Sequence, residues 1–386
     1  MFWMWVTALL GMATSFAESS LAQLYKEKDK SGQFRGGPSW YMARGLGMRW
    51  MGVLFSLFLL FAYGLIFNTV QSNSVAHALR YTFSCPEWLT GSVLALFVLL
   101  AISAGLRGVA RLMQWLVPIM ALLWVTASLV VAALHFEQVP GGHWRPSFKS
   151  AFGWREVASG ALGYTLSQAL MAGFQRGMFS NEAGMGSTPN VAAAASSWPP
   201  HPAAQGIVQM IGVFMDTVII CSASAMILLL AGPVPHTSDA VGIQYLQQAL
   251  VNLTGGWGAG FVSLILMLFS FSSIVVNYLY AENNLIFLRF NARPAILLLR
   301  LGVILMVFAG ALLTMPMIWQ LADVIMALMA ITNLTAILLL SPVVTLIAKD
   351  YLRQRKLGVA PVFDASRYPE IASQLAPGTW DDLPRR

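Results

Sequence analysis

Charged residues are scarce in this sequence. Asp, Glu, Lys and Arg together make up 10% of the 386 residues, whereas soluble domains contain about 25%. Hydrophobic residues make up 57% of the chain, and they occur in long unbroken runs. This composition excludes an ordinary soluble protein, and the unbroken runs exclude a β-barrel, whose strands alternate in polarity. We therefore predict an all-α polytopic membrane protein.

Residues that commonly carry catalysis or bind metals are also few. The chain has two cysteines and five histidines. The histidines have no zinc-binding spacing, and no nucleophile elbow or phosphate-binding loop occurs. The net charge of +7 comes from loops between apolar runs, so it does not indicate a nucleic-acid partner. These observations predict a protein that is not an enzyme, has no cofactor and binds no nucleic acid.

The apolar runs predict about nine membrane spans. Lys and Arg are concentrated in alternate loops and in the last 40 or so residues, which places the C-terminus in the cytoplasm. We expect a transmembrane domain over residues 1–347 and a flexible cytoplasmic tail over 348–386. The predicted spans are residues 1–24, 51–79, 89–106, 115–135, 155–175, 203–231, 257–281, 295–314 and 318–347.

The start of the chain conflicts with this count. Nine spans and a cytoplasmic C-terminus place Met1 outside the cell. Yet residues 1–5 (MFWMW) are already membrane sequence without a charged flank, and nothing resembles a signal peptide. We therefore predict that helices are missing before Met1.

The segment at residues 176–189 (RGMFSNEAGMGSTP) is unusually polar for a membrane protein. Each glycine inside a helix costs about 1 kcal/mol relative to alanine, and a charge in the bilayer costs several kcal/mol unless it is paired or hydrated. The preceding glycines, which include Gly173 and Gly177, indicate either close helix packing or a broken helix. A break would free backbone groups for a carboxylate or for Na⁺.

The predicted spans at residues 1–24 and 51–79 contain polar residues, and each set of polar residues has two interpretations. Glu18 is either a snorkelling or capping carboxylate, or the gate partner of a cytoplasmic arginine. Asn68, Gln71 and Ser72 share one helix face. They either hold helices together or bind a zwitterion, since amides offer donors and acceptors without net charge.

Later spans add further candidates. Asp216 lies in the middle of a span and is either an ion or proton site or a buried hydrogen-bonding group. The hydroxyls of Ser272 and Ser273 either bond to the carbonyl one turn earlier or help to bind an alkali cation.

Several of these segments together resemble the alanine or glycine:cation symporter family, which contains the sodium:alanine symporters. RGMFSNEAGMGS at residues 176–187 is the most specific match. The resemblance runs in order from Met1 to about residue 347. The other matching segments are residues 2–11 (FWMWVTALLG), 16–18 (FAE), 35–38 (RGGP), 71–74 (QSNS), 117–118 (VP), 205–206 (QG) and 214–217 (FMDT).

The resemblance implies a LeuT-like fold with a five-plus-five inverted repeat, in which the span at 155–175 is the second broken helix. It also implies that about two N-terminal helices are missing, one of which supplies ligands for substrate and sodium. The chain alone is then expected not to transport, and Na⁺-dependent alanine uptake by vesicles containing only these residues would contradict that. Asn277 stands where the family usually has an aromatic residue, and this smaller, polar side chain is expected to widen the pocket or to admit a polar substrate.

The resulting prediction is Na⁺-coupled symport of a small neutral amino acid of the alanine or glycine type across the cytoplasmic membrane. The alternative is a non-transporting remnant or an interaction subunit of such a transporter. The predicted substrate residues are Gln71, Asn73, Phe179, Ser180, Ser273 and Asn277, the sodium residues are Ser272 and Ser273, and the gating or structural residues are Glu18, Arg176, Asn181, Glu182 and Asp216. Arg176 is expected to pair with Glu182, or Glu182 with a cytoplasmic arginine.

Overall fold

The computed structural model describes residues 1–30, 32–135, 162–231, 242–313 and 315–380. Within these residues the chain is helical apart from one short antiparallel pair of strands, β1 (Glu27–Lys28) and β2 (Phe34–Arg35). The helices of the first half are α1 (Phe2–Leu24), α2 (Pro38–Arg44), α3 (Arg49–Phe61), the π-helical η1 (Ala62–Ile66), α4 (Phe67–Phe83), α5 (Glu87–Ser103) and α6 (Gly105–Leu134).

The second half continues the same architecture. Its helices are α8 (Leu162–Asn181), α9 (Pro189–Ala194), α10 (Pro202–Val213), the π-helical η4 (Phe214–Cys221), α11 (Ser222–Ala231), α12 (Ile243–Thr254), α13 (Trp257–Phe287), α14 (Arg293–Leu312), α15 (Met315–Leu339), α16 (Ser341–Lys356), the single turn η5 (Ala365–Arg367) and α17 (Pro369–Ala372).

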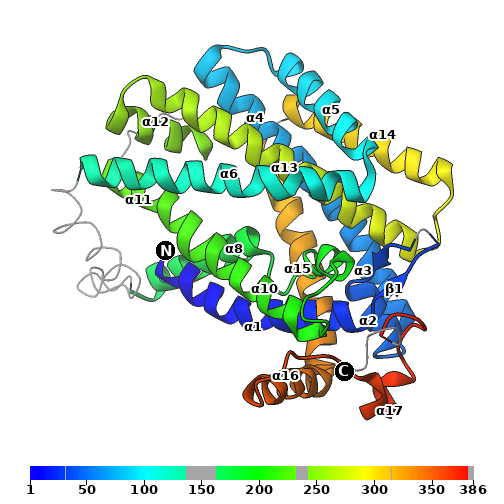
Figure 1. Cartoon of the computed structure of the whole chain (residues 1–386). Helices are drawn as coiled ribbons and strands as arrows, with labels where there is room; N and C mark the ends of the chain where they lie inside the picture. Colours follow the sequence, from blue (N-terminus) through cyan, green and yellow to red (C-terminus); the bar gives the residue numbers. More distant parts are fainter. Residues whose placement is uncertain (31, 136–161, 232–241, 314, 381–386) are drawn as a thin grey trace.

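The helices pack as two groups with α15 between them (Figure 1). In one group α1 contacts α8, α9 and α10, and in the other α4 contacts α5, α13 and α14. Helix α15 contacts α1 on one side and α3, η1 and α4 on the other. Helices α6, α11 and α12 pack beside α13 through an apolar cluster that contains Trp124, Ile227 and Leu250. Helix α15 therefore contacts both groups.

Among the described residues, six helical segments are long and apolar enough to cross a membrane: residues 49–83, 105–134, 202–231, 257–287, 293–312 and 318–339. Three predicted spans fall short of that description. Helix α5 has only 17 residues, and α1 and α8 carry polar residues along much of their length. The first part of the predicted span at 155–175 lies outside the described residues. The count of about nine spans remains a prediction.

The predicted last span at 318–347 is wrong as one helix. Helix α15 ends at Leu339, and α16 begins at Ser341 with a proline in its first turn. Proline has no backbone N–H to continue the helix, and it restricts the residue before it. The predicted domain boundary at residue 347 therefore lies inside α16.

The tail is packed rather than flexible over its described part, which ends at residue 380. The Trp380 indole donates to the carbonyl of Leu24 at the end of α1 over 3.1 Å. The Tyr25 hydroxyl donates to Gln374, and the backbone N–H of Phe363 donates to Pro200. Phe363 and Trp380 are almost fully buried. The mixed charge of the tail concealed these few apolar anchors.

His201 joins this tail to the start of α10. Its Nδ1 accepts from the backbone N–H of Ala203 at 3.1 Å, so Nε2 carries the proton and faces Asp350 at 3.4 Å. Burial lowers the pKa of His201 to about 4, although the hydrogen bond and the charge of Asp350 partly oppose that shift. The side chain is fully buried and lies against the rings of Tyr351 and Phe363.

Folding stability is expected to fall as the pH drops from 7 to 5. Free histidine has a pKa near 6.5, so the unfolded chain takes up this proton before the folded protein does. The shift corresponds to a loss of about 2 kcal/mol over this range. Thermal unfolding of the purified protein at both pH values would measure it. His201→Asn keeps an acceptor for Ala203 and should flatten the pH dependence, whereas His77→Asn in α4 should not. An unchanged slope in His201→Asn would contradict the assignment.

Candidate functional site

The chain between α8 and α9 leaves the helix for seven residues. Glu182, Gly184 and Gly186 have φ values of +54°, +85° and +81°, in the left-handed region that favours glycine. Residues 176–181 of the RGMFSNEAGMGS segment are the last residues of α8. Gly184 and Gly186, which follow, form the turn. Before the break, Gly173 packs against Trp3 and Gly177 against Thr7 of α1. Gly173 and Gly177 therefore serve close packing inside a continuous helix, and the break lies further on, at Gly184 and Gly186.

Glu18 of α1 anchors this break. Its carboxylate accepts from the backbone N–H of Gly184 at 3.3 Å and from the amide of Asn333 in α15 at 2.8 Å. The same amide donates to the carbonyl of Gly184 at 3.0 Å. Glu18 is completely buried, so it does not snorkel, and among the described residues it pairs with no arginine. Of the predicted roles only capping agrees with these contacts, because the carboxylate accepts from a backbone N–H that the break leaves free.

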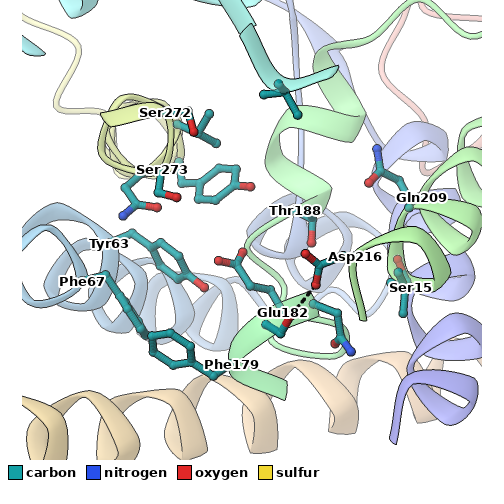
Figure 2. A pocket seen from close by; sticks show the side chains of 18 of the residues that line it. Ser15, Tyr63, Phe67, Phe179, Glu182, Thr188, Gln209, Asp216, Ser272 and Ser273 are labelled. Carbon is teal, nitrogen blue, oxygen red and sulfur yellow. Dashed lines mark hydrogen bonds between the residues drawn. The ribbon is translucent and has the colours of Figure 1, made fainter. Parts of the chain in front are cut away.

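A cavity of about 470 Å³ lies beside the break, between α8, η4, α4 and α13. Figure 2 shows its side chains: Glu182 and Asp216 face across to Ser272 and Ser273, with Tyr63, Phe67 and Phe179 along one side. The lining residues that the structure describes include two carboxylates and no lysine or arginine. They are Ser15, Tyr63, Phe67, Gln71, Val117, Phe179, Ser180, Asn181, Glu182, Thr188, Gln209, Gly212, Val213, Asp216, Ser272, Ser273, Val276, Asn277 and Tyr280.

Asp216 and its neighbours form the acidic end of the cavity. Asp216 lies on the π-helical η4 and accepts from the hydroxyl of Ser180, the bond drawn in Figure 2. Thr217 also approaches it at 3.4 Å, and Thr217 accepts from the amide of Asn181 at 3.0 Å. Oxygen ligands of this kind suit a hard cation or a substrate ammonium group. This end can therefore bind positive charge.

Glu182 and Arg176 do not pair. Glu182 accepts from the hydroxyl of Ser187 within the break. Arg176 lies over the ring of Trp319 in α15, with its guanidinium carbon 5.0 Å from the ring centre. The predicted local ion pair is absent, and Glu182 has no arginine partner among the described residues. The guanidinium gains a cation–π contact instead.

Aromatic rings close one side of the cavity. Phe179 lies 5.5 Å from Phe67 and 5.0 Å from Trp319, measured between ring centres. Tyr63 packs edge-on against Tyr280 at 5.3 Å. Sequence reasoning missed Tyr63 and Tyr280, because an aromatic residue in an apolar run carries no signal of its own.

The opposite end of the cavity is polar but neutral. Gln71, Ser273 and Asn277 line it, as does Ser272. The Ser272 hydroxyl donates to the carbonyl of Phe269 at 2.8 Å, so it bonds back to its own helix and keeps only acceptor capacity for a cation. The back-bonding interpretation of this serine is therefore confirmed, although to the carbonyl three residues earlier, and its role in binding a cation stays a prediction.

Asn73 is the one predicted substrate residue that does not line the cavity. Its amide donates to the carbonyls of Gly310, at 2.7 Å, and of Leu313 in the next turn of the chain. These bonds join α4 to the end of α14, so Asn73 holds helices together. On α4, residues three and four apart share a face, but residues two apart do not. Gln71 thus reaches the cavity and Asn73 does not.

The long apolar helices and the cavity with its two carboxylates define the class of the protein, a multi-pass membrane transporter. The chain belongs to the sodium:alanine symporter family, whose profile matches residues 1–365. Members of this family are symporters rather than enzymes, with an amino acid and Na⁺ as substrates and Na⁺ as the coupling ion. The match begins at residue 1 and does not support the predicted N-terminal truncation.

Three relatives illustrate the range of similarity. The chain is 66% identical to the uncharacterized transporter YaaJ of Escherichia coli, over 99% of this chain and 80% of the relative. It is 42% identical to the probable sodium/glutamine symporter GlnT of Bacillus subtilis, over 94% and 74% of the two chains. It is 36% identical to the sodium/alanine symporter AgcS of Methanococcus maripaludis, over 92% and 78%.

Proposed function

We propose that this protein imports a small neutral amino acid of the alanine or glycine type together with Na⁺ across the cytoplasmic membrane. The observation that carries the proposal is the cavity itself. It has carboxylates at one end, neutral hydrogen-bonding groups at the other, and no lysine or arginine among its described lining residues. A zwitterion and a cation can share such a space, because the carboxylates offset the positive charges and Na⁺ can offset the substrate carboxylate.

In this proposal Gln71, Phe179, Ser180, Ser273 and Asn277 contact the substrate, and Ser272 and Ser273 contribute oxygen ligands to Na⁺. The ion gradient would favour rocking between outward-open and inward-open states of a five-plus-five inverted repeat. The break between α8 and α9 would be the second broken helix of that repeat. The lysines and arginines of the tail support a cytoplasmic C-terminus.

Uptake of radiolabelled alanine into vesicles that contain the purified protein tests the proposal. With Na⁺ outside and K⁺ inside, the initial rate is expected to exceed the rate in choline at least about tenfold, because coupling requires the cation. Lithium in place of sodium tests ion selectivity. A proton gradient without Na⁺ tests the alternative coupling ion. Undiminished uptake in choline would rule out sodium coupling.

A further inference from the structure

Two buried asparagines meet behind the neutral end of the cavity. Asn68 of α4 donates its amide to the carbonyls of Tyr63, at 2.8 Å, and of Gly64, at 3.2 Å, both in η1. Carbonyls only accept hydrogen bonds, so these contacts fix which way the Asn68 side chain points. Its oxygen then faces Asn277 of α13 and accepts from that amide at 3.0 Å.

This contact determines what Asn277 presents to the cavity. Because the amide nitrogen of Asn277 donates to Asn68, its oxygen remains as the unpaired end of the side chain. No described residue donates to that oxygen, and Asn277 is a lining residue of the cavity. This oxygen is open to the cavity, and a ligand that covers it without donating a hydrogen bond would bury an unpaired acceptor, at a cost of about 1–3 kcal/mol. The site therefore favours a ligand that supplies an N–H group here.

Gln71 presents the complementary group. Ser270 of α13 donates to the oxygen of Gln71 at 3.0 Å, and no described residue accepts from the Gln71 nitrogen. Gln71 lies one helical turn after Asn68 on the same face of α4, and it also lines the cavity. The Gln71 side chain thus presents a free amide N–H₂ to the cavity, and the Asn277 side chain presents a free carbonyl oxygen close to it.

The size and polarity of the cavity orient the ligand. Its volume of about 470 Å³ lies in the range of about 300–1,000 Å³ that is typical of pockets for molecules larger than alanine. The ammonium group of an amino acid suits the end with Asp216 and Glu182, and this directs the side chain toward α4 and α13 (Figure 2). A methyl group there would leave both amide groups unpaired, whereas a primary carboxamide has one acceptor and one donor to match them.

We propose that Asn277 and Gln71 select an amino acid with a side-chain carboxamide, and that Asn68 and Ser270 are positioning residues that fix the orientation of those two amides. This inference rests on the proposed function and refines its substrate class. Asn68 and Ser270 act through Asn277 and Gln71 and do not contact the substrate themselves.

Equilibrium binding to the purified protein in the presence of Na⁺ tests the inference without requiring transport. Tritiated glutamine is displaced by unlabelled glutamine, asparagine, alanine or glutamate, and the readout is the ratio of the alanine to the glutamine dissociation constant. Glutamine is expected to bind at least about tenfold more tightly than alanine, because alanine leaves two polar groups unpaired. Glutamate, which is nearly isosteric but charged, should bind as weakly as alanine or more weakly.

Variants separate selection from folding. Asn277→Leu should reduce the alanine-to-glutamine ratio about tenfold, and Asn68→Leu should move it in the same direction. Ser270→Ala leaves no buried charge or large cavity, and should reduce the ratio at least about threefold, because the Gln71 amide can then rotate. Ser74→Ala is the matched control, since the Ser74 hydroxyl bonds only to the carbonyl of Val70 in its own helix.

The outcomes distinguish the inference from the function on which it rests. Equal binding of alanine and glutamine by the unaltered protein, or an unchanged ratio in both Asn277→Leu and Ser270→Ala, would overturn the carboxamide site. Na⁺-driven alanine uptake would still stand in that case. Binding of no amino acid at all would overturn both.

Discussion

Asp216→Asn is expected to reduce Na⁺-driven amino-acid uptake at least about 100-fold while leaving the protein folded. Asp216 is one of two carboxylates among the described cavity-lining residues, and no lysine or arginine lines the cavity with it. Asparagine has nearly the same shape and can still accept from Ser180, so packing around η4 is preserved. The substitution removes the negative charge, and losing one partner of a buried charge pair costs about 3–5 kcal/mol, which corresponds to a factor of about 100 or more.

The initial rate of uptake and the sodium dependence of that rate would measure this effect. Asp323→Asn in α15 is the matched control, because it makes the same chemical change at a residue that does not line the cavity, and it should retain nearly full uptake. Size-exclusion profiles and unfolding temperatures should be similar for both variants. Uptake by Asp216→Asn above one tenth of the unaltered rate would show that this carboxylate does not balance the transported charge.

The helices were predictable because long apolar runs contain a strong signal. The helix from Trp257 to Phe287 contains the predicted span 257–281, and the helix from Arg293 to Leu312 matches the predicted span 295–314. The packed tail was not predictable, because its anchors, Phe363 and Trp380, contact residues more than 150 positions away. Composition cannot show contacts between distant segments.

The site was predictable as a set of polar positions but not as a set of pairs. Sequence reasoning identified Gln71, Ser273 and Asn277, and all three line the cavity. It proposed an Arg176–Glu182 pair because the two residues are close in sequence. Helix geometry instead directs Arg176 toward Trp319. Glu18 was interpreted as a snorkelling or capping carboxylate or as a gate partner, and its actual partners, Gly184 and Asn333, lie 166 and 315 positions away.

Gly186→Ala is expected to destabilise the fold by about 3 kcal/mol or more. A Cβ atom at Gly186 would lie 2.7 Å from Cγ of Pro38 and 2.8 Å from Cζ of Phe55. The proline ring is rigid and Phe55 is fully buried, so neither can move aside easily. Overpacking of this kind costs about 1–3 kcal/mol. The φ of +81° adds about 1–2 kcal/mol for a residue that has a Cβ.

Gly358→Ala separates these two contributions, because Gly358 has a φ of +73° and nothing within 4 Å of the added Cβ. The free energy of unfolding of Gly358→Ala should fall only by the cost of the left-handed backbone conformation, about 1–2 kcal/mol. Denaturant unfolding of both purified variants would give the difference, and the yield of monodisperse protein would report it where Gly186→Ala cannot be purified. Equal stability of the two variants would mean that the break between α8 and α9 is not held rigidly. In that case the close packing of Gly186 against α2 and α3 would not fix the geometry of the cavity, whose lining includes both Glu182 and Thr188 from this break.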